Sequence, residues 1–238
     1  MAAPSGFVPK QAMLFDDKLF QIIGADETLT IAQYEMSILP TFPLDSIIHD
    51  NACGLGPVTQ SILATSPSDT IKFHATDVAP PIKLVFSNST FAHSFLSFGL
   101  PIIDDPVAAA KEMYRTLKTG GTAITAFWLS ILQGESAQET RRAVWGPDTR
   151  LAVEPKMRHN DREYIRNQLV EGGFGFEDVQ LAIGQPAGGW KKEDEEKWDT
   201  EVAKYKDILT KKEGFHVDGD SKITLEAVAH VAIVKKPN

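Results

Sequence analysis

The stretch that decides the fold covers residues 50–56 and reads Asp-Asn-Ala-Cys-Gly-Leu-Gly. A short apolar segment, residues 46–49, precedes it and suits a strand. Residues 57–65 follow it and suit a helix, because they open with a proline, which the first helical turn accepts. A second apolar segment, residues 71–75, ends close to Asp77. This order predicts two parallel strands joined by a right-handed helical crossover.

The alternation of strands and helices continues downstream and predicts an α/β domain. We expect strands over residues 91–98, 122–128, 178–183 and 227–234 and helices over residues 107–117, 161–171 and 191–210. Asp105 before Pro106 suits a helix cap, and Gly120 and Gly121 are expected to end that helix. Residues 221–225 suit a strand with no identified partner.

A helical lead-in is expected before the first strand. Over residues 31–39, Ile31, Tyr34, Glu35 and Ile38 recur at helical spacing. We therefore divide the chain into a lead-in, residues 1–44, and a Rossmann-like domain, residues 45–238. Within that domain, residues 182–226 are expected to form a variable insertion or a lid. The charged helix of this region is either a solvated amphipathic helix or a cover for a substrate.

Composition excludes several classes of function. The formal net charge of −8 argues against nucleic-acid binding, which needs a basic face. The single cysteine, Cys53, excludes an internal disulfide and a cysteine zinc cluster, and the six histidines show no metal-ligand spacing. No apolar run approaches the roughly 20 residues of a membrane span, and no secretory signal is evident at the start. We expect a cytoplasmic protein without a structural metal.

The residues around the glycine turn favour one kind of ligand. Gly54 and Gly56 let backbone approach a ligand closely, and the helix N-terminus suits a carboxylate. A dinucleotide fold would place a third glycine where this chain has Thr59, which argues against NAD or FAD. Asp50 suits an ammonium group. Asp77, about 20 residues past Gly56, is placed to accept both hydroxyls of a ribose.

Three stretches carry a family resemblance. Residues 50–58, 75–80 and 112–128 resemble class I S-adenosylmethionine (SAM) methyltransferases, above all the small-molecule enzymes of ubiquinone biosynthesis and fungal secondary metabolism. The resemblance implies SAM as cofactor, a small-molecule acceptor, and a three-layer Rossmann-like sandwich of seven strands with an antiparallel last strand. It also implies a cofactor site in which the methionine part is surrounded by Asp50, Ala52, Gly54 and Gly56 and the ribose is held by Asp77. Ala52 stands where many members have glycine.

The sequence departs from the family between Pro80 and Phe91. Members normally place a helix, a third strand and an acidic loop there, and the loop usually contacts the adenine. We therefore expect this chain to lack one strand of the sheet, one helix and the loop that contacts the adenine. The short link is explained by a segment lost from the gene model, by a degenerate paralogue, or by another role. A catalytically impaired binding or scaffold subunit and a cofactor-independent cyclase therefore stay as alternatives to the enzyme. A homodimer also stays open.

Several side chains near the expected site carry two interpretations. His93 is a candidate general base for an oxygen acceptor, or else a buried packing residue. Tyr34 either closes over the cofactor or packs within the lead-in helix. Ser97, Phe98 and Trp128 are expected near strand ends, where α/β sheets bind ligands, although both aromatic residues also suit a core. Cys53 lacks the partners of a catalytic nucleophile and is interpreted as a small packed side chain.

Overall fold

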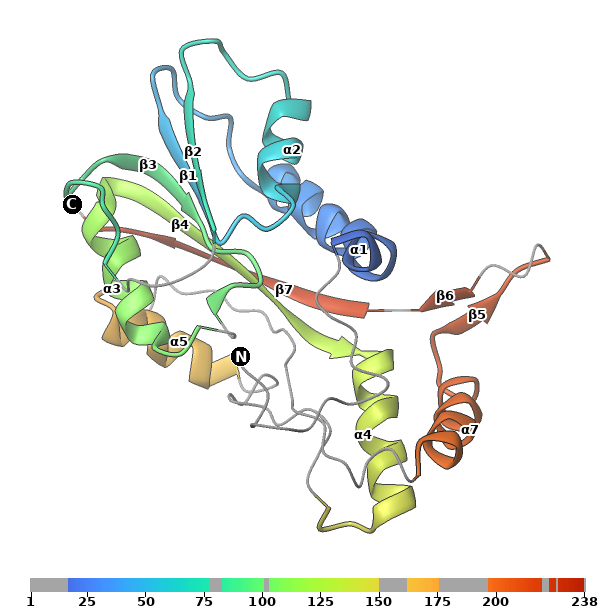
Figure 1. Cartoon of the computed structure of the whole chain (residues 1–238). Helices are drawn as coiled ribbons and strands as arrows, with labels where there is room; N and C mark the ends of the chain where they lie inside the picture. The colour runs from blue at the N-terminus through green and yellow to red at the C-terminus, as the bar shows by residue number, and fades with distance from the viewer. Residues whose placement is uncertain are drawn as a thin grey trace.

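The computed structural model describes residues 17–77, 83–100, 103–149, 162–175, 197–219, 223–225 and 227–237 (Figure 1). The helices are α1 (Asp17–Ile38), α2 (Pro57–Ala64), α3 (Pro106–Thr116), α4 (Leu132–Trp145), α5 (Arg162–Glu171) and α7 (Trp198–Leu209). The strands are β1 (Ile47–Asn51), β2 (Lys72–Thr76), β3 (Phe91–Phe95), β4 (Leu117–Ile131), β5 (Phe215–Val217), β6 (Ile223–Leu225) and β7 (Ala227–Lys235). No helix among the described residues combines the length and the apolar character that crossing a membrane requires.

A five-stranded sheet in the order β2-β1-β3-β4-β7 forms the centre of the fold. The first four strands are parallel, and β7 runs antiparallel to β4. The expected Rossmann-like sheet with an antiparallel last strand is therefore confirmed. Among the described residues, β2 is an edge strand, at the side where the family would continue with a third strand. The strand expected at residues 178–183 lies outside the described residues.

Helices cover both faces of the sheet, which gives the three layers. In Figure 1, α1 and α2 lie on one face and α3 and α5 on the other. Under α3 and α5 the core contains Phe91, Leu96, Leu100, Ala110, Met113, Leu117, Ala123, Phe127, Leu169 and Phe174. Under α1 and α2 the core contains Ala32, Phe42, Ile48, Val58, Ile62, Ile71, Phe95 and Ile124. Burial of these two apolar sets on opposite faces supplies the main driving force for this arrangement.

The start of α3 confirms the sequence prediction, but its end does not. The Asp105 side chain accepts a hydrogen bond from the backbone N–H of Ala108 at 2.9 Å, as an N-cap does. The helix ends at Leu117, which adopts an extended conformation and begins β4 directly. The prediction that Gly120 and Gly121 end the helix was wrong. Gly121 lies inside β4, where a Cβ would come 2.8 Å from the Lys118 carbonyl oxygen.

The lead-in helix is longer than predicted and is rotated about its axis. It begins at Asp17, and over residues 28–38, where burial is described, the buried positions are Ala32 and Glu35. Tyr34 and Ile38, which the helical spacing placed on the inner face, are 52% and 41% exposed. The inner face follows the positions of Ala32, Glu35 and the partly buried Met36 and Leu39. A carboxylate therefore takes a position that the sequence pattern suggested for apolar side chains.

The last part of the chain builds a second group of helices at the end of β4. β4 continues into α4, and α7 packs against α4 (Figure 1). Between them Arg141 forms a buried ion pair with Glu201 at 3.0 Å, and the Trp145 indole N–H donates to the same carboxylate oxygen. The β5–β6 pair follows, which gives the segment at residues 223–225 its partner. Of the charged helix expected over residues 191–210, the described part is α7, and it is fastened to α4 along its buried side.

Candidate functional site

The glycine turn after β1 presents open backbone. Ala52, Gly54 and Gly56 all have positive φ angles, of 54°, 51° and 78°. The Gly56 N–H donates to the Cys53 carbonyl at 2.7 Å, and the Cys53 N–H donates to the Thr76 carbonyl at 3.0 Å. A Cβ placed on Gly54 would find no atom within 4 Å. The turn is therefore held from beneath, while the space beside Gly54 is free for a ligand.

Asp50 ties β1 to the helix after the turn. It is 3% exposed, and its Oδ2 accepts the backbone N–H of Thr59 at 3.1 Å and the Thr59 hydroxyl at 2.6 Å. The carboxylate therefore caps α2, whose own N-cap residue, Gly56, has no side chain for this purpose. Burial raises the pKa of Asp50, and the Thr59 hydrogen bonds lower it. From the sequence, Thr59 served only as evidence against a dinucleotide ligand. In the structure its two hydrogen bonds hold the Asp50 carboxylate in place.

Asp77 lies beside the same turn. Asp50 pairs in register with Ala75, and Asn51 with Thr76, so Asp77 follows directly where β2 ends next to β1. The negative charge of Asp77 is close enough to Asp50 to raise the pKa of that carboxyl. Burial raises the pKa of the Cys53 thiol, and the charges of Asp50 and Asp77 raise it further. The two carboxylates and the glycine turn therefore share one region, and Cys53 is kept as a neutral thiol there.

A short hydrogen-bond chain fixes the ends of β1 and β2 relative to each other. His49 Nε2 and Thr76 Oγ1 are 2.8 Å apart, and the Thr76 hydroxyl donates to Asn51 Oδ1 at 3.1 Å. The His49 ring also stacks on Phe91, with centroids 4.6 Å apart. Burial lowers the pKa of His49 to about 4, and His74 adds to this effect. A neutral imidazole thus holds together the two strand ends that carry Asp50 and Asp77.

A third carboxylate, that of Glu35, approaches the site from α1. Glu35 is fully buried, and its Oε1 accepts the Ser97 hydroxyl at 2.6 Å. Ser97 follows the end of β3, so this bond fastens α1 to the edge of the sheet where the strands end. Burial raises the pKa of Glu35 to about 8; the Ser97 bond opposes this shift and the Asp50 charge adds to it. Glu35 is therefore within electrostatic reach of the glycine turn.

His93 lies inside the apolar core under α1 and α2. Its ring meets Phe42 edge-on with centroids 4.9 Å apart, and it is 6% exposed. Burial lowers its pKa to about 4, and Lys235 lowers it further. His93 pairs in register with Thr122, which pairs with Lys235 at the end of the antiparallel strand β7. His93 therefore lies nearer the end of the sheet where the parallel strands begin, away from the glycine turn. This position favours the packing interpretation over the general base.

The remaining predicted side chains lie around the strand ends. Tyr34 lies on α1 with 52% of its surface exposed. Phe98 has a positive φ of 61°, and its ring stacks on Trp128 with centroids 4.5 Å apart. Both aromatic residues are half-buried. An aromatic pair therefore follows β3 and lies along β4, on the side of β1 opposite to Asp77.

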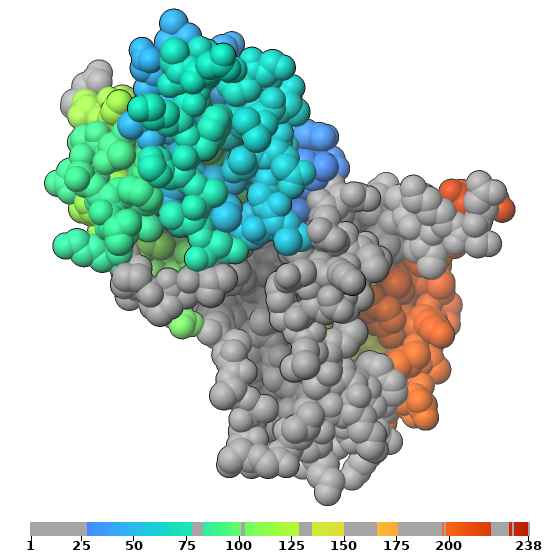
Figure 2. Space-filling model, turned by 45° about the horizontal axis from the view of Figure 1, so that its top comes forward, coloured from blue at the N-terminus to red at the C-terminus, as the bar shows by residue number. Residues whose placement is uncertain are grey.

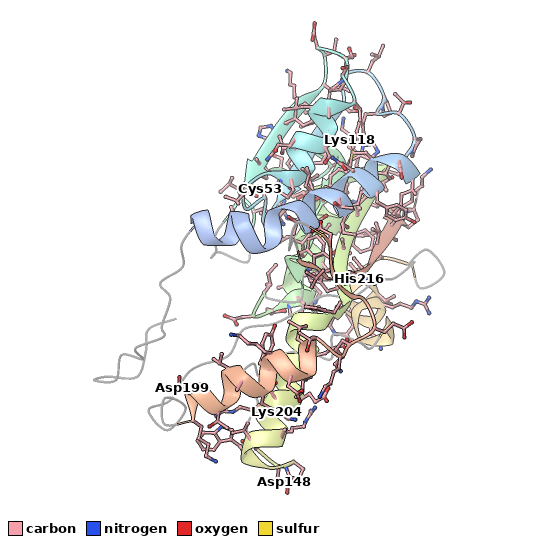
Figure 3. All side chains as sticks on the ribbon, turned by 90° about the vertical axis from the view of Figure 1, so that its right-hand side faces the viewer. Cys53, Lys118, Asp148, Asp199, Lys204 and His216 are labelled. Carbon is pink, nitrogen blue, oxygen red and sulfur yellow. The ribbon has the colours of Figure 1, made fainter. Side chains whose placement is uncertain are left out.

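The region expected to be an insertion or a lid does not cover the glycine turn with its described helix. In Figure 3, Cys53 lies in the upper half of the molecule, and Asp199 and Lys204 of α7 lie in the lower half. Figure 2 likewise shows α7 apart from the surface formed by β1, α2 and β2. A hollow of about 580 Å³ lies along the exposed face of α7. It is remote from the carboxylates of Asp50 and Asp77, so we do not assign it to the candidate site.

Two site residues were missed by sequence reasoning. Glu35 was read as one member of a helical face, although an acid at a position with apolar spacing is itself a signal of a buried functional group. Thr59 was considered only because it stands where a dinucleotide fold would have its third glycine. Among the described residues, no group of three or more His, Cys, Asp or Glu side chains is arranged to hold a metal ion.

Comparisons with known proteins place the fold. No family model matches the sequence, and no curated protein matches it. The structure is similar to that of phosphoethanolamine N-methyltransferase 2 from Haemonchus contortus, with a TM-score of 0.51 and 13% identity, over 93% of this chain and 57% of that one. It is also similar to a SAM-dependent methyltransferase from Aquifex aeolicus, with a TM-score of 0.50 and 12% identity, over 73% of this chain and 95% of that one. The structural neighbours are thus SAM-dependent methyltransferases of the class I fold, and the likeness is one of fold.

Proposed function

We propose that this protein binds SAM at the glycine turn and transfers its methyl group to a small molecule. The observation that carries the proposal is the meeting of Asp50 and Asp77 with the open turn at Gly54. The sheet order also supports it, because α/β folds bind ligands outside the carboxyl ends of their parallel strands. The choice of a small-molecule acceptor, and of a role in secondary metabolism, follows the sequence resemblance.

The residues present fit SAM chemically. The exposed backbone at Gly54 and Gly56 suits the amino acid part of the cofactor, and the start of α2 suits its carboxylate. Asp77 is exposed at the end of β2 and suits the two ribose hydroxyls. The negative charges of Asp50 and Asp77 suit a ligand that carries an ammonium and a sulfonium. When bound, SAM supplies an electrophilic methyl group.

The chain's own contribution to the reaction is alignment and charge. A fixed turn and two positioned carboxylates hold the donor in one orientation, which lowers the entropy cost of an in-line displacement. The Asp50–Thr59 and His49–Thr76 hydrogen bonds keep that geometry rigid. The half-buried Phe98–Trp128 pair excludes water on the β3 side of the site. In this proposal His93 takes no part.

A thermal-shift titration with SAM and S-adenosylhomocysteine tests the proposal. A ligand that binds only the folded chain stabilises it by about 2.7 kcal/mol at 100 times its dissociation constant. We expect both ligands to raise the melting temperature in a concentration-dependent way, and adenosine alone to have a much smaller effect. No shift at millimolar concentration of either ligand would contradict the proposal.

The edge position of β2 favours a second candidate, a methyltransferase-like subunit that binds partners without transferring methyl groups. Most β2 residues are exposed or half-buried, and none of the described strands pairs beyond them. An open strand edge is a ready surface for pairing with another chain. Equilibrium sedimentation separates the candidates: a scaffold subunit would associate through this edge and would not respond to SAM.

A further inference from the structure

Glu35 carries a buried oxygen that the fold does not use. Its Oε1 is bonded to Ser97, whereas its Oε2 is buried and has no hydrogen-bond partner among the described residues. A buried polar atom without a hydrogen-bond partner destabilises the folded chain. An apolar side chain at this position of α1 would avoid the cost, since the neighbouring Ala32 packs in the core. The free oxygen therefore points to a ligand that completes its bonding.

The surroundings of Glu35 select the charge of that ligand. Asp50 is near enough to raise the pKa of Glu35, so the two carboxyl groups interact electrostatically. The charge most favourable there is positive, because a cation is attracted to Asp50 and stabilises the ionised form of Glu35 against the cost of burying it. Within the described part of the chain, no Lys or Arg forms an ion pair with Glu35 or Asp50; the ion pairs found there involve residues of α3, α4 and α7.

The aromatic pair beside Ser97 suits the same kind of ligand. Phe98 follows Ser97 directly, and its ring stacks on Trp128 at an interplanar angle of 24°. Ile124 belongs to the core under α1, and alternation along β4 places Trp128 on that same face. The faces of Trp and Phe rings attract organic cations, and quaternary ammonium groups in particular. A carboxylate and two aromatic rings thus lie toward one side of the sheet.

The strand order of the sheet places Ser97 and the Phe98–Trp128 pair on the other side of β1 from the residue proposed to bind the ribose, Asp77. β1 lies between β2, which ends before Asp77, and β3, which ends before Ser97. A donor seated on the glycine turn with its ribose toward Asp77 would therefore present its other end toward Ser97 and Glu35. That side of β1 is where the second reactant must enter.

We propose that Glu35, Ser97 and the Phe98–Trp128 pair form the acceptor subsite and select an acceptor that carries a positively charged nitrogen. The inference rests on the proposed methyl transfer and narrows its substrate class. A protonated amine would donate to the free Oε2, and a fully substituted ammonium would be held by charge and by the ring faces. A cation at this place also favours the ionised carboxylate, against the burial that raises the Glu35 pKa to about 8.

The test compares choline with its neutral carbon isostere, in which a tert-butyl group replaces the trimethylammonium group. Binding of each to the full chain is measured by saturation-transfer NMR, with and without saturating S-adenosylhomocysteine. We expect choline to bind at least about tenfold more tightly than the isostere. Glu35→Gln should abolish this preference, and Trp128→Leu should weaken binding of choline. The matched control is Glu139→Gln. Glu139 lies on α4 and forms an exposed ion pair with Lys212, so this substitution should leave the preference intact.

The outcomes separate this inference from the proposed function. Equal binding of choline and the isostere, or an unchanged preference in Glu35→Gln, overturns the inference. The affinity for S-adenosylhomocysteine is measured separately on each variant, and the control Glu139→Gln should stay within about twofold of the wild type. Absence of S-adenosylhomocysteine binding to the wild type overturns the proposed function. If Glu35→Gln is misfolded, Ser97→Ala, which removes the hydroxyl that orients Glu35, should reduce the preference instead.

Discussion

Thr59 donates both its backbone N–H and its hydroxyl to a single oxygen of Asp50, at 3.1 and 2.6 Å. The helix after the glycine turn is thereby capped by an acid from the preceding strand. Asp50 also interacts electrostatically with Asp77 and Glu35. The Asp50–Thr59 pair therefore affects both the stability of the turn and the charge of the candidate site.

Thr59→Val should weaken both the fold and the site. The substitution keeps the side-chain shape and removes the hydroxyl, so the buried Asp50 oxygen loses its shorter hydrogen bond. Hydrogen bonds to charged groups contribute about 1.5–3 kcal/mol, and we expect the free energy of unfolding in urea to fall by that order. Thr59→Ser keeps the hydroxyl and is the control. Equal stability of the Val and Ser variants would show that the bond is unimportant.

Asp77→Ala should reduce the affinity for S-adenosylhomocysteine without affecting folding. Asp77 is exposed, so its removal leaves no buried cavity. Loss of a carboxylate that binds two ribose hydroxyls should weaken binding by at least about tenfold, measured by calorimetry. Asp69→Ala, at an exposed position before β2, should bind normally. Unchanged affinity of Asp77→Ala would remove Asp77 from the site.

Gly54→Val should also reduce cofactor affinity. A Cβ at this position would meet no protein atom within 4 Å, and the valine side chain would occupy the space proposed for the ligand. The positive φ of 51° adds a conformational cost of about 1–2 kcal/mol. Gly146→Val is a matched control, since Gly146 also has a positive φ, of 99°, and open space around it, yet lies after α4. Equal losses of affinity in the two variants would assign the effect to backbone strain alone.

The strand and helix order was predictable because local signals mark it. Pro57 and Pro106 mark the starts of α2 and α3, Gly172 follows the end of α5, and the apolar runs of β1, β2, β3 and β7 stand out from their surroundings. The end of α3 was not predictable in the same way. A Gly-Gly pair that commonly follows a helix is used here inside β4, where Gly121 avoids contact with backbone oxygens of Lys118 and Ala92.

The features that sequence missed depend on contacts between distant residues. α4 carries few apolar side chains at helical spacing, and its partner α7 joins it through the Arg141–Glu201 pair, 60 positions apart. Glu35 and Ser97 are 62 positions apart. No local pattern announces such pairs. The glycine turn and the two aspartates were predictable because they lie at the ends of strands that the sequence itself marks.

Glu35 should make the folded chain less stable as the pH rises. Between pH 4.5 and about 8 the carboxyl is ionised in the unfolded chain and protonated in the folded one, so the folded state binds more protons. The stabilising contribution is complete below pH 4.5 and is lost as the pH rises to about 8; the total is on the order of 5 kcal/mol. The free energy of unfolding of Glu35→Gln, relative to wild type, should rise across this range. A flat difference would contradict the shift.

His93 should have the opposite pH dependence. The imidazole is neutral in the folded chain down to about pH 4 and becomes protonated in the unfolded chain below pH 6.5, so stability falls as the pH drops through this window. His49 has a similar shift, and His93→Gln should therefore remove about half of the loss, on the order of 3 kcal/mol. Cofactor affinity should stay unchanged. Methyl transfer abolished in a folded His93→Gln chain would restore His93 as the base.

A crystal structure of the chain with S-adenosylhomocysteine tests the central claim most directly. We predict that both ribose hydroxyls lie within hydrogen-bonding distance of the Asp77 carboxylate and that the amino acid part rests on the backbone of Gly54 and Gly56. Density for the ligand elsewhere, with Asp77 facing only solvent, would contradict the account.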